Sequence, residues 1–213
     1  MNAILTSVES VGPSVPDLDP SNVNHLLLGC GSFTEKRISL PDGPYEWSNL
    51  VTIDMNPDVN PTVEWDLERL PLPFPDNVFD EIHAYEVLEH TGRQGDFRFF
   101  FAQFSDFWRM LKPDGHLMVT VPMWDSPWAW GDPSHTRVIT DGSLVFLNQQ
   151  EYINQIDKPI NGKKTSMTDF RRWYQADFEC VGGTRGEHQF QFVLKAVKPS
   201  RHHDFAVGTV SGS

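Results

Sequence analysis

Short apolar runs alternate with polar, turn-forming stretches through the first 122 residues, and five of these runs have the length of buried strands. They occupy residues 23–28, 50–53, 62–65, 78–84 and 116–121. A short apolar run bounded by turn residues is typical of a strand that is buried on both faces of a parallel sheet. The pattern therefore predicts a parallel sheet in this part of the chain.

One longer segment has helical periodicity, with an aromatic face that we expect to pack against the sheet. Its apolar positions are Phe97, Phe100, Phe101, Phe104, Phe107, Trp108 and Leu111. Lys112–Gly115 should end this helix and turn the chain. Strands, turns and a helix in this order predict a doubly wound α/β fold.

The pattern loosens after Pro122. We expect a long loop over 124–137, a helical segment over 141–155, and two strands over 170–179 and 189–197 that pair as an antiparallel hairpin through 182–186. At 213 residues the chain has the length of one domain. The expected division is a loose lead-in (1–21), a domain (22–198) with halves at 22–122 and 123–198, and a flexible tail (199–213).

Composition narrows the possible partners. The formal net charge of −12 argues against a protein that grips nucleic acid. Two distant cysteines form no disulfide framework, and no apolar run reaches the ~20 residues of a membrane span. The N-terminus also lacks a secretion-signal pattern, so we expect a cytoplasmic monomer or homodimer with no membrane contact.

The ends of the first two strands carry the candidate chemistry. Gly29–Cys30–Gly31 follows the first strand, and Asp54 ends the second. A glycine turn and a following acid can hold a nucleoside at the edge of a parallel sheet. Thr34 stands where a dinucleotide fingerprint needs its third glycine, and no P-loop lysine follows, so a nucleoside without pyrophosphate is favoured. A lone Gly-x-Gly can also be a plain strand-to-helix turn.

Several further motifs follow in a fixed order. They are Leu28–Gly31, Ile53–Asp54, Trp65–Glu68, Leu72–Asn77, Phe79–Ile82, Glu86–His90 and Leu111–Gly115. In this order they resemble the class I S-adenosylmethionine-dependent methyltransferases, in particular the small domains of the methyltransferase type 11 group. The resemblance covers roughly residues 23–122. It implies a Rossmann-like, mostly parallel seven-stranded sheet and S-adenosylmethionine as cofactor.

The resemblance also implies cofactor-binding positions, which are Gly29, Cys30, Gly31, Asp54, Met55, Asp66, Leu67 and Glu86. Asp54 would accept the ribose hydroxyls, Met55 would pack on adenine, and Asp66 would accept from the adenine amino group. The structural alternatives are a helix cap for Asp54, a turn cap for Asp66 and a core position for Met55.

Three features depart from the family pattern. Leu27 replaces an acid that many relatives carry two residues before the first glycine, and Phe33 replaces a third glycine. The interval from Gly29 to Asp54 is longer than the ~20 residues of dinucleotide folds, because of an insert over 41–47.

The methyl acceptor has a weaker signature. Asp132, Glu86, His135 and His90 are possible general bases. We favour His135 and His90, with a solvated loop and a packing or capping role as the respective alternatives. We assign no metal ligands. Residues 84–87 lack the Asn/Asp-Pro-Pro-aromatic motif of amino-methyltransferases acting on bases. We therefore expect methyl transfer to the oxygen or nitrogen of a small molecule, with a peptide acceptor or a non-catalytic scaffold as alternatives.

Overall fold

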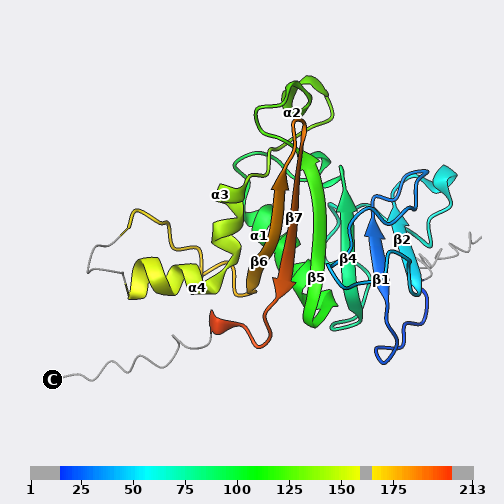
Figure 1. Ribbon diagram of the computed structural model, residues 1–213, viewed down its shortest axis with the longest axis horizontal. Helices are drawn as coiled ribbons and strands as arrows, with labels where there is room; N and C mark the ends of the chain where they lie inside the picture. The colour runs from blue at the N-terminus through cyan, green and yellow to red at the C-terminus, as the bar shows by residue number, and fades with distance from the viewer. Residues whose placement is uncertain (1–14, 159–164, 203–213) are drawn as a thin grey trace, which may run out of the picture.

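A seven-stranded sheet with the order β3-β2-β1-β4-β5-β7-β6 forms the centre of the computed structural model, which describes residues 15–158 and 165–202 (Figure 1). The strands are β1 (His25–Leu28), β2 (Leu50–Asp54), β3 (Val63–Glu64), β4 (Phe79–Tyr85), β5 (Leu111–Pro122), β6 (Phe178–Arg185) and β7 (Gln189–Ala196). Strands β1 to β5 pair in parallel, whereas β7 pairs antiparallel with both β5 and β6. The predicted parallel sheet with an antiparallel C-terminal hairpin is confirmed.

The helix α1 (Phe97–Met110) covers one face of the sheet. It begins at Asp96, whose side chain accepts a hydrogen bond from the Phe99 amide. Phe101, Phe104 and Phe107 are buried in the main core, so the predicted aromatic face is confirmed. The remaining helices are short: α2 (Pro127–Gly131), α3 (Asp141–Leu144), α4 (Gln149–Tyr152), the 3₁₀ turns η1 (Pro57–Val59), η2 (Leu88–His90) and η3 (Val145–Leu147), and the π-helical turn η4 (Ile153–Asp157).

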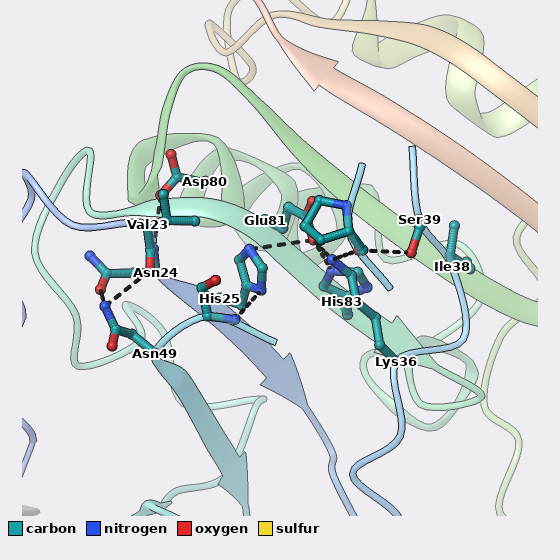
Figure 2. Close-up of polar contacts among 12 residues, drawn as sticks. Val23, Asn24, His25, Lys36, Ile38, Ser39, Asn49, Asp80, Glu81 and His83 are labelled. Carbon is teal, nitrogen blue, oxygen red and sulfur yellow. Dashed lines mark hydrogen bonds and ion pairs between the residues drawn. The ribbon is translucent and has the colours of Figure 1, made fainter. Parts of the chain in front are cut away.

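The connection from β1 to β2, residues 29–49, contains no helix, so irregular chain covers the other face of the sheet there. Buried polar groups attach it to the sheet (Figure 2). The Lys36 ammonium lies 2.7 Å from a Glu81 carboxylate oxygen, which also lies 2.8 Å from His83 Nε2. Backbone amides of residues 37 and 38 donate to the Tyr85 hydroxyl. We call His25, Lys36, Glu81, His83 and Tyr85 the Glu81 network.

The Glu81 carboxylate stays ionised although it is buried. Burial raises the pKa of Glu81, but hydrogen bonds from His83 and Lys36 outweigh it and bring that pKa to about 2. The Lys36 side chain is only 1% exposed, so the pair is shielded from solvent. A buried charge of this kind is stable only with its partners in place, and the network therefore fixes the path of the connection.

Of the last two strands, β7 lies where it was predicted, whereas β6 does not. Strand β6 runs from Phe178 to Arg185, so the predicted strand at 170–179 and connection at 182–186 are both wrong. Phe170 and Tyr174 instead stack on Phe101 of α1. Strand β5 begins at Leu111 rather than at His116, so the predicted turn at 112–115 lies within the strand, where its ladder with β4 is interrupted.

The ends of the described chain pack on the domain. Val15 and Leu18 contact the main core, within the segment expected to be a loose lead-in. Arg201 forms an ion pair at 2.7 Å with Asp177, which is fully buried, so residues up to 202 are held although the tail was expected to begin at 199. The rest of the predicted tail lies outside the described residues. No helix in the described part of the chain is long and apolar enough to span a membrane.

Candidate active site

A cleft of about 610 Å³ opens at the carboxyl ends of β1, β2 and β4. This is the edge where open α/β sheets bind their ligands. Its lining comes from the ends of these strands and from the loops that follow them: Gly29, Asp54, Met55, Trp65, Asp66, Leu67, Glu68, Val87, His90, Thr91, Gly92, Arg93 and Thr136. We call it the carboxyl-edge cleft.

Gly29, the first glycine of the turn, lines the carboxyl-edge cleft. Gly29 and Gly31 have φ angles of +56° and +53°, which are left-handed conformations that favour glycine. A Cβ at Gly29 would lie 2.2 Å from Cγ2 of Val87. The first glycine is thus required both by its backbone conformation and by close packing against the chain that follows β4.

Asp54 is held by the same turn. One carboxylate oxygen accepts from the Gly31 amide at 2.9 Å, and the other accepts from the Asn56 amide at 2.9 Å. Each carboxylate oxygen can accept more than one hydrogen bond, so both retain capacity for a ligand. The carboxylate is therefore oriented in advance for a pair of hydroxyl donors in the cleft.

The opposite wall is acidic and apolar. Asp66 accepts from the Glu68 amide at 2.9 Å, and the Glu68 carboxylate accepts from the Gly92 amide at 2.7 Å. Leu67 is buried, whereas Met55 is 68% exposed and free to cover a planar ligand. The sequence analysis did not single out Glu68, although it lies within the motif that contains Asp66.

Three of the residues assigned to the cofactor do not line this cleft. The Cys30 thiol is buried on the other face of the sheet with Leu27 and Ile38, and burial raises its pKa. Gly31 contributes through its bond to Asp54. Glu86, with a strained φ of +52°, accepts a hydrogen bond from Gln189.

The two candidate bases lie together although 45 positions separate them in the chain. The imidazole rings of His90 and His135 have centroids 4.7 Å apart. His90 lines the carboxyl-edge cleft, while the His135 side chain is 9% exposed and lies behind it. Glu89, which sequence reasoning did not single out, is buried beside them.

A second cavity of about 340 Å³ lies between α1 and α3. Arg93 lines both this cavity and the carboxyl-edge cleft, so the two are adjacent. Five of its fifteen lining residues are phenylalanines, namely Phe97, Phe100, Phe101, Phe146 and Phe170. We call it the phenylalanine pocket, and its lining suits a ligand with an apolar or planar body.

Comparison with known proteins gives one family model and several similar solved structures. Residues 27–119 match the family model described as "Methyltransferase domain". No curated protein matches the chain. A SAM-dependent methyltransferase from Archaeoglobus fulgidus is similar at 13% identity over 83% of this chain and 87% of its own, with a TM-score of 0.48. The N-methyltransferase NodS from Bradyrhizobium japonicum is similar at 16% identity over 83% of this chain and 87% of its own, also with a TM-score of 0.48.

Proposed function

We propose that this chain, whose residues 27–119 form a methyltransferase domain of the S-adenosylmethionine-dependent class, transfers a methyl group to the oxygen or nitrogen of a small molecule. The observation that carries the proposal is the position of Asp54, whose carboxylate is held by two backbone amides in a cleft at the ligand-binding edge of the sheet.

The lining of the carboxyl-edge cleft fits the cofactor. S-adenosylmethionine has ribose hydroxyls, an adenine amino group and cationic groups, but no phosphate. The carboxylates of Asp54, Asp66 and Glu68 match these donors and positive charges. The glycine turn brings backbone close to the ligand, and Met55 and Leu67 supply apolar contacts.

The bound cofactor supplies an activated methyl group for an in-line displacement, and the chain's own task is to align the acceptor and exclude water. The phenylalanine pocket would hold the body of the acceptor next to the cleft. Of the two candidate bases, His90 lines the cleft and would receive a proton from an acceptor that arrives protonated, with His135 packed beside it.

A titration of the purified protein with S-adenosylmethionine and S-adenosylhomocysteine tests the cofactor site. We expect saturable micromolar binding of both. Asp54→Asn should weaken it by about 10- to 100-fold, since hydrogen bonds to a charged group contribute about 1.5–3 kcal/mol. Asp58→Asn, which removes an exposed carboxylate on η1, is the matched control and should bind like wild type.

The outcomes separate the alternatives. An Asp54→Asn affinity within threefold of wild type would contradict the assigned site. Turnover with peptides but with no small molecule would favour a peptide acceptor. Tight cofactor binding without turnover of any acceptor in a broad screen would favour a non-catalytic scaffold.

A further inference from the structure

A buried carboxylate without partners lies next to two imidazoles at the back of the carboxyl-edge cleft. Glu89 is 2% exposed, and within the described residues neither of its carboxylate oxygens has a hydrogen-bond partner. His90 and His135 each offer a nitrogen such that the ligand atoms of all three residues lie within 4.8 Å of one another. We call these three residues the Glu89 cluster.

An uncompensated carboxylate in this position is costly. The nearby Arg137 guanidinium bonds to the Leu88 carbonyl, Thr91 and Gln103 rather than to the Glu89 carboxylate. Among the described residues, the buried Glu89 carboxyl group therefore has neither a hydrogen-bond donor nor a bonded cation.

The hydrogen bonds around His90 fix its free nitrogen. The Ser134 hydroxyl donates its single hydrogen to the Asp132 carboxylate, with the two oxygens 2.6 Å apart. It can therefore only accept from His90 Nδ1, which lies 3.0 Å away. The proton of the neutral ring is then on Nδ1, and Nε2 keeps the lone pair that a metal ion requires.

His135 shows a similar arrangement. Its Nε2 faces the Asp132 carboxylate at 3.9 Å, whereas its buried Nδ1 has no partner in the described part of the chain. Metal-binding histidines commonly present one nitrogen to the ion and the other to a carboxylate or other acceptor. Ser134 thus accepts from His90, and the Asp132 carboxylate lies beside His135.

We propose that Glu89, His90 and His135 bind a divalent transition-metal ion of the zinc type at the acceptor side of the cleft. Two imidazoles and one carboxylate form a ligand set that suits Zn²⁺ and its neighbours better than Mg²⁺, and it leaves a coordination position open. Because His90 lines the cleft, an ion held by this residue would lie next to the ligand space. The metal site stands on its own geometry. Its use in holding an acceptor oxygen depends on the proposed function, and with the ion bound His90 and His135 would act as ligands rather than as bases.

Metal binding can be measured without cofactor or acceptor. Protein freed of metal with a chelator is titrated with Zn²⁺ by calorimetry, and with Co²⁺ by visible absorption. We expect about one equivalent of each to bind, with a cobalt spectrum that reports nitrogen and oxygen ligands in a low-symmetry site.

Two variants and one control locate the site. Glu89→Gln keeps the side-chain shape and His90→Ala changes an exposed residue, and each should weaken Zn²⁺ binding at least 100-fold. His188→Ala, which removes an exposed imidazole near α2, should leave Zn²⁺ affinity unchanged. Absence of saturable binding, or variants that bind as tightly as wild type, would overturn the proposal. S-adenosylmethionine affinity is measured separately in chelator, so failure of the metal site and failure of the cofactor site are distinguishable.

Discussion

Removal of the Lys36 ammonium would test whether the Glu81 network holds the connection between β1 and β2. Lys36→Met keeps the length of the side chain but leaves the Glu81 carboxylate, 7% exposed as a residue, without its cationic partner. Loss of one member of a buried pair typically costs about 3–5 kcal/mol.

The pKa of Glu81 gives an independent estimate of this cost. A pKa of about 2 in place of 4.5 corresponds to about 3 kcal/mol in favour of the charged form, at about 1.4 kcal/mol for each tenfold change. Because burial raises this pKa, the combined contribution of His83 and Lys36 exceeds that net value, and Lys36 supplies a share of it. We therefore expect Lys36→Met to lower the free energy of unfolding by about 3 kcal/mol at pH 8, or roughly 6–12 °C in Tm.

The loss of stability caused by Lys36→Met should be smaller at lower pH. Burial lowers the pKa of both His25 and His83, and the charge of Lys36 lowers them further, while Glu81 raises them. Without Lys36, one imidazole accepts a proton more readily as the pH falls from 8 to 6 and replaces the lost charge. Glu81 itself stays charged in this range, because its contribution is lost only as the pH falls from 4.5 towards 2.

Urea unfolding at pH 8 and pH 6 measures these effects in a double-mutant cycle of Lys36→Met and Glu81→Gln. Lys195→Met is the matched control, since that lysine is 32% exposed and its ion pairs are 3.6 Å long. Its loss should change stability by less than about 0.5 kcal/mol. Our reasoning is refuted if Lys36→Met costs less than about 1 kcal/mol at pH 8, or if the two single changes simply add.

Two further changes test the glycine turn and the C-terminal anchor. Gly29→Ala should lower the free energy of unfolding by about 2–4 kcal/mol and weaken cofactor binding, because of its left-handed φ and its clash with Val87. A second change, Val87→Ala, should restore part of the stability and part of the cofactor binding. Thermal unfolding and calorimetric titration measure the two effects. Arg201→Ala should lower stability by about 3 kcal/mol in thermal unfolding, since Asp177 loses its buried ion pair. A similar loss in Arg185→Ala, whose ion pair is exposed, would contradict that explanation.

The apolar pattern predicted those strands and the helix in which apolar residues form a continuous run or face. Strands β1, β2, β4 and β5 appear close to their expected positions because each buries a continuous apolar run. Strand β6 was misplaced because it lies at the edge of the sheet, contains Gly182 and Gly183, and exposes most of its residues. The aromatic residues at Phe170 and Tyr174 suggested a strand but pack on α1 instead.

The sequence pattern indicated only some of the residues in each polar cluster. Glu81, His83 and Tyr85 occupy alternate positions of β4 and therefore share one face, but their partner Lys36 comes from a connection with no periodicity. In the same way, Glu89 and His90 stand in a visible motif, whereas His135 joins them only through the fold. Contacts between strands and irregular loops depend on the path of the loop, which local pattern does not specify.

The end of β4 connects the separate parts of the site. Tyr85 belongs to the Glu81 network, Val87 packs on the glycine turn, and Glu89 and His90 belong to the Glu89 cluster. The turn depends on the β1–β2 connection, whereas the cluster is tied to residues 136 and 137 by backbone and guanidinium hydrogen bonds. Lys36→Met should therefore weaken S-adenosylmethionine binding more than Zn²⁺ binding. Equal losses of both would mean that the end of β4 moves as one unit.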